Sequence, residues 1–432
     1  MPKDRVVVGI DIGSGKIATV IATLPIDAAP NVIGVAQVSS RGLRKSQVVD
    51  IEEAVASIHE CLELAERMAG YSVSKAFVTV GGTHIECQNS KGVVAVSEPQ
   101  GEIDQDDVRR VIEAARAISL PSSREIIHVI PRYFIVDSQI GIKDPMGMTG
   151  VRLEVETHIV SGAATSLRNI AKCVQEVGVD VEGLVFSGIA ASESVLSETE
   201  KELGVILVDF GAGTTDICIF VEGALAYSVV LPVGARNVTN DLAIGLRVSL
   251  EAAEKIKLAL SARLKTPVNP GEEWLQEEDH KKEQKEEEEY LDVSKLGIDE
   301  EIKKVSKKTL AEGIMKPRLR EILKMIRNEI ARSGFGGMTP AGIVITGGGA
   351  ETTGLIELAK HELAMPVRVG VPQGATGLVE ELENSSFAAT LGLIIYGAKA
   401  ESQEEARLPL VGRVEIKGLV GKGVDWIKSL LP

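Results

Sequence analysis

Two short stretches, far apart in the chain, share one order of residue types: an apolar strand, an aspartate, a glycine-rich turn and a second apolar strand. They are VGIDIGSGKIATV, residues 8–20, and VDFGAGTTDICIF, residues 208–220, and their aspartates are Asp11 and Asp209. Glycine turns bring backbone N–H donors close to a phosphate without side-chain obstruction. Carboxylates alone would repel a triphosphate, so the two aspartates predict a bound Mg²⁺ ion. Mg²⁺ usually keeps several of its water ligands, and the aspartates could hold it through those waters. We expect the two hairpins to face each other around a metal-bound nucleotide.

Two familiar phosphate-binding motifs do not match these turns. A Walker A loop requires a glycine where Ile10 stands, and a serine or threonine after Lys16, where Ile17 stands. The dinucleotide-binding fingerprint opens a helix, whereas each turn here leads into a second strand. A clasp made of two hairpins is therefore the arrangement that the sequence favours.

A third glycine turn and a helix complete the candidate site. TGGGAETTG, residues 346–354, opens from a strand end and suits the surface under a base or an α-phosphate. In EAAEKIK, residues 251–257, Glu254 and Lys257 are three residues apart and share a helix face. Glu254 would bind ribose hydroxyls and Lys257 would lie along the base, with a plain surface ion pair as the competing interpretation.

Composition limits the class of protein. The chain has 432 residues, 44% of them hydrophobic and 25% charged, which is ordinary for a globular protein and too long for one core. The formal charge of −15 argues against generic nucleic-acid binding. No signal peptide follows the N-terminal MPKDR, and no apolar run approaches the roughly 18–20 residues that cross a bilayer. No metal or redox spacing relates the four cysteines, which we interpret as buried thiols in a reducing cytosol: Cys61, Cys87, Cys173 and Cys218.

Strand-like runs alternate with helical patterns, which predicts α/β layers. Helices are expected at 50–70, which has an acidic start and a closing glycine, and at 104–118, which lies inside a small α+β block at 84–160. The segment 265–308 is charged, with its densest part at 271–290, and is typical of a solvated helix or loop. An amphipathic helix at 310–334 should bend at Pro317, and the ordered fold should end near Tyr396.

The ordered set of glycine turns resembles the phosphate 1, phosphate 2 and adenosine motifs of the actin-like ATPase superfamily. Within it, most of the chain outside the charged segment is similar to the FtsA family of bacterial cell-division proteins. The stretch DPMGMTGVRLE, residues 144–154, is the most specific of those that carry the similarity. The others include GLVFSGIAASESVL, LAEGIMKPRLREIL and GIVITGGGAETTGLIELA.

The resemblance implies two duplicated ribonuclease-H-like lobes around a nucleotide cleft, with an inserted small α+β subdomain of the 1C type. The implied boundaries are 1–83 and 161–197 for subdomain 1A, 84–160 for 1C, 198–235 and 312–381 for 2A, 236–311 for 2B with the charged segment 265–308, 382–400 for a closing segment of 1A, 401–416 for a linker and 417–432 for a tail helix. Asp11 and Asp209 would be the catalytic acids that hold Mg²⁺ through water. The implied ATP-binding residues are Gly13, Ser14, Gly15, Lys16, Gly211, Gly213, Thr214, Thr215, Asp216, Glu254, Lys257, Gly347, Gly348 and Gly349.

One departure from related chaperones bears on turnover. Those chaperones place a hydrolytic glutamate at the position that we align with Gly188, which has no carboxylate. General-base help worth about 10²–10⁴-fold would then be missing. We expect at most a slow ATPase that acts as a nucleotide switch. The alternative from another class is a small-molecule kinase of the same fold, which needs a carboxylate to deprotonate its substrate. A chaperone ATPase fits the sequence less well, because the sequence contains no second, β-rich peptide-binding domain. A pilus-assembly relative of the same fold also fits less well, because of DPMGMTGVRLE and the tail.

The last residues, KGLVGKGVDWIKSLLP at 417–432, form a separate element. An apolar stripe with lysines at its flanks predicts a helix that lies in a membrane surface, or else one that docks on the protein's own core. The family resemblance favours the membrane. The residues of the stripe are Leu419, Val420, Val424, Trp426, Ile427, Leu430 and Leu431.

By resemblance, the partners are the C-terminal tail of the tubulin-like FtsZ on subdomain 2B, further copies of the chain in filaments, anionic lipid, and other division proteins through 1C. The basic run 303–320 is a candidate seat for the FtsZ tail, and Lys303, Lys304, Lys307 and Lys308 lie in it. The expected location is the cytoplasmic face of the cell membrane at the division site, with peripheral attachment and no nucleic-acid partner.

Overall fold

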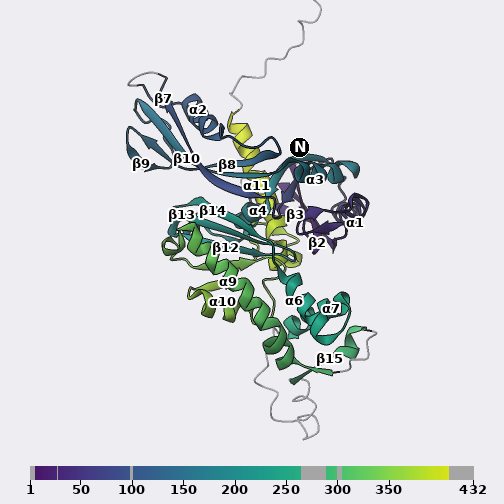
Figure 1. Cartoon of the computed structure of the whole chain (residues 1–432). Coiled ribbons are helices and arrows are strands. Elements are labelled where there is room, and N and C mark those ends of the chain that lie inside the picture. Colours follow the sequence, from purple (N-terminus) through teal and green to yellow (C-terminus); the bar gives the residue numbers. More distant parts are fainter. Residues whose placement is uncertain (1–4, 27, 98–100, 264–288, 299–303, 408–432) are drawn as a thin grey trace, which may run out of the picture.

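The computed structural model describes residues 5–26, 28–97, 101–263, 289–298 and 304–407, and they form two lobes and an inserted domain (Figure 1). The predicted tail helix at 417–432, its apolar stripe, and nearly all of the segment 271–290 lie outside the described residues. No helix in the described part is long and apolar enough to cross a membrane. All four cysteines are free thiols, and Cys87 alone among them is only half-buried.

Lobe I is built on a six-stranded sheet in the order β11-β6-β1-β2-β3-β19. β1 pairs antiparallel with β2, as the first hairpin predicts, and parallel with β6, which in turn pairs parallel with β11. β1 and β2 are buried on both faces, which explains their nearly continuous apolar sequence. The strands are β1 (Arg5–Ile12), β2 (Lys16–Leu24), β3 (Asn31–Ser39), β6 (Lys75–Val80), β11 (Asp180–Phe186) and β19 (Thr376–Gly377).

Lobe II repeats this plan with a five-stranded sheet in the order β14-β13-β12-β17-β18. Its first three strands form an antiparallel meander, and β17 and β18 continue in parallel from β12. The core of the lobe I sheet has the same connectivity, so the predicted duplication of ribonuclease-H-like lobes is confirmed. The strands are β12 (Val205–Phe210), β13 (Thr215–Val221), β14 (Ala224–Leu231), β17 (Ile343–Thr346) and β18 (Val367–Val369).

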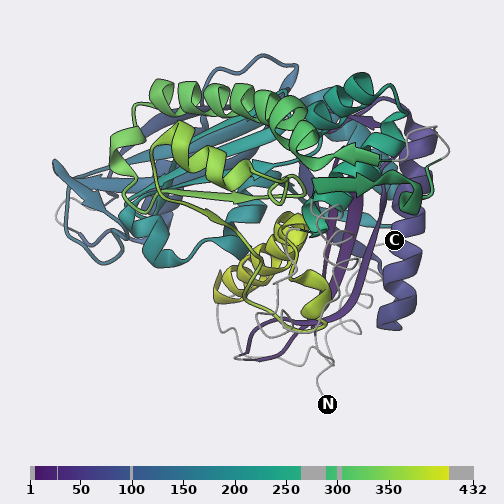
Figure 2. The same cartoon turned by 90° about the horizontal axis from the view of Figure 1, so that it is seen from below.

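Helices fill the space between the two sheets and cover their outer faces. α4 (Ser187–Val195) and α11 (Ala388–Arg407) share one core with residues of both sheets. α1 (Ile51–Ala69) and α3 (Ala164–Glu176) cover the other face of lobe I. On lobe II the outer layer contains α9 (Lys316–Ser333) with α10 (Leu355–Leu363) beside it, as Figure 2 shows from below.

The helices predicted at 50–70 and 104–118 are both present. Asp50 accepts a hydrogen bond from the Glu53 amide at the start of α1, and Gly70 ends that helix in the left-handed conformation. α2 (Gln105–Arg116) begins with a capping box between Asp104 and Asp107.

The inserted domain carries α2 and a four-stranded antiparallel sheet in the order β7-β10-β8-β9. α2 covers this sheet and closes a small separate core. In Figure 1 the domain lies beside β13 and β14 of lobe II. The strands are β7 (Glu86–Ala95), β8 (Arg124–Val136), β9 (Gln139–Ile142) and β10 (Arg152–Ala163).

The far end of lobe II holds a smaller group of elements. α6 packs on α7 and on the π-helical segment η2, whose last residue directly precedes α9. β15 pairs antiparallel with β16 in a two-stranded sheet. The bounds are α6 (Ala235–Leu246), α7 (Leu250–Arg263), β15 (Tyr290–Asp292), β16 (Lys304–Ser306) and η2 (Thr309–Met315).

The helix predicted at 310–334 is present as η2 followed directly by α9, with Pro317 in the first turn of α9, and the bend at Pro317 stays a prediction. One prediction about a helix end is wrong. The ordered fold does not end near Tyr396, because α11 continues to Arg407, and the linker expected at 401–416 therefore begins inside that helix.

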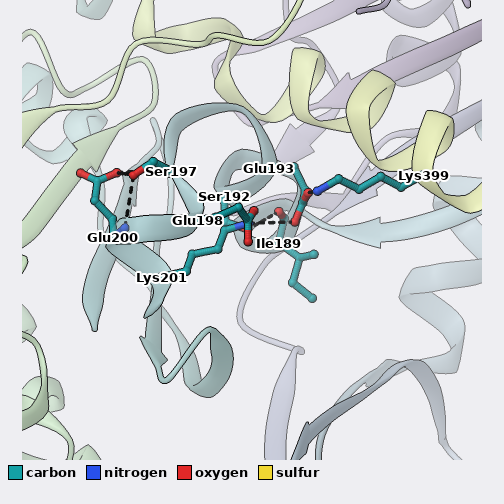
Figure 3. A network of polar contacts seen from close by, with 8 residues as sticks. All are labelled: Ile189, Ser192, Glu193, Ser197, Glu198, Glu200, Lys201 and Lys399. Atoms are coloured by element: carbon teal, nitrogen blue, oxygen red, sulfur yellow. Dashed lines mark hydrogen bonds and ion pairs between the residues drawn. The ribbon is translucent and has the colours of Figure 1, made fainter. Parts of the chain in front are cut away.

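An ion-pair network fixes α11 to α4 (Figure 3). Glu193, on α4, lies between Lys399 of α11 and Lys201 of α5 (Glu198–Leu203), with 3.4 Å between its Oε1 and the Lys201 Nζ. The Lys201 side chain is 6% exposed, and its amine is paired with the carboxylates of Glu193 and Glu198. Burial opposes ionisation of Glu193, but the two lysines overcome this effect and lower its pKa.

Candidate functional site

A cavity of about 660 Å³ lies between the lobes and gathers the residues that the sequence predicted. Both hairpin turns, the third glycine turn and α7 line it. The predicted residues found in its wall are Asp11, Gly13, Ser14, Gly15, Lys16, Asp209, Gly211, Gly213, Thr214, Asp216, Glu254, Lys257, Gly347, Gly348 and Gly349.

Thr215 is the exception among the predicted residues. Its side chain is buried, and its hydroxyl donates to the Val233 carbonyl at 2.8 Å instead of lining the cavity. Thr215 begins β13, where successive side chains point to opposite faces. Asp216, the next residue, therefore faces the cavity.

The topology explains why these segments meet. β1, β6 and β11 run parallel, so their carboxyl ends lie at one edge of the lobe I sheet, and β12 and β17 do the same in lobe II. Crevices outside the carboxyl ends of strands are the usual ligand sites of open α/β sheets. The duplicated fold places two such edges against each other.

Glycines allow the turns to approach closely. A Cβ on Gly15 would lie 2.7 Å from the Ala212 Cβ of the opposite hairpin, and one on Gly213 would lie 2.9 Å from the Ser14 Oγ. A Cβ on Gly348 would meet only the Ser386 Cβ, at 3.8 Å, so the backbone there borders open space. The first two glycines permit contact between the lobes, and Gly348 leaves room for a flat ligand.

Three carboxylates lie together in the cleft and destabilise one another as anions. Burial raises the pKa of Asp11, although Lys16 and a 2.7 Å hydrogen bond from Thr79 favour its charged form. Burial and repulsion from Asp216 and Asp11 raise the pKa of Asp209 well above its ordinary value. Burial also raises the pKa of Asp216 to about 6, although Ser187 donates a hydrogen bond to its Oδ2. The Oδ1 of Asp216 is buried without a partner.

Lys16 provides positive charge in the cleft. Its Nζ lies 4.1 Å from the centroid of the Phe387 ring and donates to Gln37 Oε1 at 3.2 Å. Burial lowers its pKa to about 8, while Asp11 and Asp209 favour the protonated form. A phosphate would therefore meet an amine already held beside the carboxylates.

Gly188 is the position that the sequence analysis aligned with the hydrolytic glutamate of the chaperones. A Cβ on Gly188 would lie 2.6 Å from the Cys218 Sγ, so that position faces the core. Ser187, directly before it, lines the cavity and donates to Asp216. Neither position carries a carboxylate, so the reasoning about a missing base applies to Ser187.

Glu254 and Lys257 form the ion pair that the competing interpretation expected, with 2.8 Å between Lys257 Nζ and Glu254 Oε2. The pair is nevertheless part of the cavity wall. Lys257 is buried and also donates to the Thr239 hydroxyl at 3.0 Å.

Several wall residues were not predicted from the sequence. Except for Glu351, which lies in the third glycine turn, they come from segments that carry no phosphate-binding signal of their own: Gln37, Ser39, Ser46, Thr79, Ser187, Leu258, Ser261, Glu351, Asn384 and Ser386. Thr79 and Ser187 lie at the ends of strands parallel to β1, and this position was the one signal that could have identified them.

The residues present fit a magnesium nucleotide. A cation or an ordered water would stabilise the three carboxylates, which repel each other, and would give Asp216 Oδ1 a partner that it lacks among the described residues. Amides of the glycine turns and Lys16 suit phosphate oxygens, and the open backbone at Gly348 suits a flat base. Bound Mg²⁺ would supply charge neutralisation of the phosphates, which Asp11 and Asp209 would support through water.

Two family models match the chain. Residues 82–161 match the SHS2 domain inserted in FtsA, and residues 206–392 match the cell division protein FtsA. The first range coincides closely with the block at 84–160 that the sequence set apart as an insertion.

Full-length relatives give the same family. The chain is 37% identical to cell division protein FtsA of Pseudomonas aeruginosa over 92% of its length and 90% of that protein. It is 38% identical to FtsA of Bacillus subtilis, covering 86% of the chain and 80% of that protein. It is 33% identical to FtsA of Escherichia coli, covering 99% and 96%.

Solved structures of lower identity share the fold. The chain superposes on a component of a PilM-PilN type IV pilus biogenesis complex with a TM-score of 0.61 at 15% identity, covering 91% of this chain and 98% of that one. MreB 5 of Spiroplasma citri, bound to AMPPNP, gives a TM-score of 0.51 at 13% identity, covering 94% and 100%. The predicted actin-like architecture is confirmed.

Proposed function

Because the chain belongs to the FtsA family of cell division proteins, we propose that it binds ATP with Mg²⁺ between its lobes, forms filaments, and attaches the FtsZ ring to the cytoplasmic face of the cell membrane. The proposal that the chain binds a nucleotide rests on one observation: three glycine turns from distant segments and three carboxylates line a single cavity. MreB 5, which has the same fold, was solved with AMPPNP bound, and this supports the choice of ligand.

In this proposal each part of the wall has one task. The turns at Ser14–Lys16 and Gly211–Thr214 hold the phosphates by their amides. Glu254 and Lys257 contact the ribose and the base, and the turn at Gly347–Gly349 lies under the adenosine. Asp11 and Asp209 orient the waters of Mg²⁺. Since neither Gly188, where the sequence places the missing glutamate, nor its neighbour Ser187 carries a carboxylate, turnover is slow and the nucleotide acts as a switch.

Calorimetric titration of ATP tests this part. We expect binding that weakens when EDTA removes Mg²⁺, and an Asp11→Asn/Asp209→Asn variant in which Mg²⁺ no longer strengthens binding. Asp106→Asn, on the exposed surface of α2, is the matched control and should behave as the wild type. Binding of ATP that is indifferent to Mg²⁺ in the wild type would contradict the assigned roles of the two aspartates.

Membrane attachment is assigned to the tail at 417–432. The strength expected for it can be worked out from the free energies of burial, of ordering and of attraction to lipid. Seven large apolar side chains at about 1.5 kcal/mol each amount to roughly 10 kcal/mol of gross burial. Ordering the tail costs about 1–2 kcal/mol per residue, and lysines near anionic lipid add about 1 kcal/mol each. At the lower end of this range the cost of ordering is close to the sum of the two gains, so one tail binds weakly, whereas many tails on one filament bind firmly because each later attachment is intramolecular.

Sedimentation with anionic vesicles tests the membrane part. Full-length protein with ATP should pellet with the vesicles, and a chain that stops at Ala406 should stay in the supernatant. A Trp426→Asp variant keeps the length of the tail and should lose most of the pelleting. Unchanged pelleting of the truncated chain would eliminate the tail as the anchor.

The surface around α6 and η2 is the proposed seat of the FtsZ tail. Ile244 is 77% exposed at the end of α6, and the next residue, Gly245, packs against Ile314 of η2. The basic run that contains Lys307 and Lys308 leads directly into η2. An exposed apolar side chain beside lysines suits a peptide that is both acidic and apolar.

A peptide with the sequence of the FtsZ tail should therefore bind the wild type more tightly than a charge-reversed variant of Lys303, Lys304, Lys307 and Lys308. Ile244→Ser should also weaken binding. Ile140→Ser, at an exposed position on the inserted domain, is the matched control. Equal affinities for all variants would remove this surface from the proposal.

A further inference from the structure

Thr79, near the carboxyl end of β6, lies beside Asp11, near the carboxyl end of β1. The two strands are parallel neighbours and are paired at Ile10 and Val78. Asp11 and Thr79 are the next residues on each strand, so they are level with each other in the sheet. Both side chains line the cavity between the lobes.

The Thr79 hydroxyl makes two hydrogen bonds. It accepts from the Ile12 amide at 3.0 Å and donates to Asp11 Oδ1 at 2.7 Å. An amide N–H can only donate, so the single proton of the hydroxyl is free for the carboxylate. Thr79 is 2% exposed, which shields both bonds from bulk water. The side chain therefore ties the Asp11 carboxylate to the backbone of the residue that follows it.

This tie restricts the direction of the Asp11 carboxylate. With Oδ1 held by Thr79, rotation about the Cβ–Cγ bond is limited and Oδ2 keeps one orientation. Mg²⁺ demands a nearly ideal octahedral arrangement of its ligands, so an acceptor for its water ligands must point in a defined direction. Carboxylates at metal sites are themselves commonly oriented by hydrogen bonds from neighbouring groups.

The next strand of lobe I repeats the arrangement. β11 pairs parallel with β6, and Ser187, directly after β11, donates a hydrogen bond to Asp216 Oδ2. The backbone leaves room for this contact at Gly81, where a Cβ would lie 2.9 Å from Ser187 Oγ and 3.8 Å from Asp216 Oδ2. Two neighbouring strand ends thus each present a hydroxyl to a carboxylate of the cleft. The repetition indicates that the bond between Thr79 and Asp11 serves the cavity as well as the packing of the sheet.

We propose that Thr79 is a positioning residue for the magnesium site, whose hydroxyl orients Asp11 to accept hydrogen bonds from the water ligands of the ion. Thr79 acts only through Asp11 in this role. The inference rests on the proposed binding of a magnesium nucleotide, and it assigns a task to a wall residue outside the three glycine turns.

Calorimetry on the full chain tests this role by measuring how strongly Mg²⁺ improves AMPPNP binding over binding in EDTA. Thr79→Val keeps the branched shape, loses the hydroxyl and should reduce this improvement about tenfold or more, since outer hydrogen bonds of this kind are worth about 10- to 100-fold in metal affinity. The affinity in EDTA should stay unchanged. Thr79→Ser keeps the hydroxyl and should restore the wild-type improvement.

Thr19→Val is the matched control. Thr19 is a buried residue of β2 in the same sheet, and its hydroxyl donates to Cys61 Sγ at 3.4 Å without lining the cavity. This variant loses a buried hydroxyl as Thr79→Val does, but it should leave the effect of Mg²⁺ unchanged. Thr79→Val also deprives the Ile12 amide of its acceptor, so binding is measured below the unfolding temperature of each variant. Thr79→Ala carries the same prediction if Thr79→Val does not fold.

A second background tests whether Thr79 acts through Asp11. In an Asp11→Asn chain, Thr79→Val should cause no further loss of the Mg²⁺ effect, because residues that act as one unit are not additive. An equal loss in both backgrounds would refute the route through Asp11. If the wild type binds AMPPNP more tightly with Mg²⁺ and Thr79→Val retains all of this gain, the role of Thr79 fails while the proposed function stands. If the wild type does not bind AMPPNP at all, the proposed function fails and the role of Thr79 fails with it.

Discussion

Acidification should weaken the contact between the inserted domain and lobe II through His158. This histidine of β10 is buried, with its Nδ1 2.7 Å from Asn89 Oδ1 and its Nε2 2.8 Å from Ser228 Oγ of β14. Asn89 Nδ2 donates to the Ala226 carbonyl at 3.2 Å, which leaves its Oδ1 to accept from Nδ1–H. Nδ1–H therefore donates to Asn89 Oδ1, and Nε2 lies against the Ser228 hydroxyl, which itself donates to Cys87 Sγ at 2.8 Å.

The expected loss of folding stability on acidification follows from the pKa of His158. Burial, with repulsion from Arg132 and His128, lowers the pKa of His158 from 6.5 to about 4. Between these values the unfolded chain binds a proton that the folded chain does not, so the stability contribution is complete above pH 6.5 and is lost as the pH falls toward 4. Between pH 7 and pH 5 the loss is about 2 kcal/mol, since each pH unit in this window is worth about 1.4 kcal/mol.

Urea unfolding at pH 7 and pH 5, followed by far-UV circular dichroism, measures the effect. His158→Gln retains a donor and an acceptor but does not titrate, so its unfolding free energy should fall between the two pH values by about 2 kcal/mol less than that of the wild type. The carboxylates with raised pKa in the nucleotide cleft act in the opposite direction, and they cancel in this difference because both proteins contain them. An equal fall in both proteins would refute the assignment of a buried neutral imidazole.

Three further predictions concern single contacts. Gly15→Ala places a Cβ 2.7 Å from the Ala212 Cβ of the opposite hairpin, and the overpacking, at about 1–3 kcal/mol, should weaken ATP binding by about 5- to 150-fold. Gly337→Ala is the control, because its Cβ meets no atom within 4 Å and should leave ATP binding unchanged. Calorimetry measures the affinity of both variants. Asp104→Ala removes the capping box of α2 and should cost about 1 kcal/mol, seen as faster hydrogen exchange in that helix and not in α1. Glu193→Gln leaves buried Lys201 without its nearest shielded carboxylate and should lower the unfolding free energy by up to about 3 kcal/mol in urea, while an unchanged midpoint would show that the network is dispensable.

Much of the candidate site was predictable because its main parts are local. In each hairpin the aspartate, the glycines and the second strand are consecutive residues, so their types and spacing carry the signal for a turn that presents amides. The caps of α1 and α2 are also local, since Asp50 and Asp104 contact residues three positions later. The charged segment and the tail were recognised by composition, and their structure stays a prediction.

The rest of the site depends on contacts between distant segments. Thr79 and Ser187 reach the cleft because β6 pairs with β1 and β11 pairs with β6, and Ser46 reaches it because the turn between β4 (Leu43–Arg44) and β5 (Gln47–Val48) contacts Ser14. The residue types next to each of them in the sequence do not indicate a ligand. The direction in which each side chain points could not be predicted from the sequence either, because a shift of one residue in a strand or at the start of a helix turns the side chain to the other face.

The two strand–turn–strand units and the third glycine turn could be recognised in the amino-acid sequence, because each consists of consecutive residues, and the likeness of the first two units revealed the duplication. The three-dimensional fold was needed to show that Ser187 and not Gly188 faces the cleft, that Thr215 turns away from it, and that α11 extends to Arg407. One cause accounts for all three. Local spacing sets backbone conformation, but burial against a partner far along the chain selects which side chain points into a cavity and how long a helix persists.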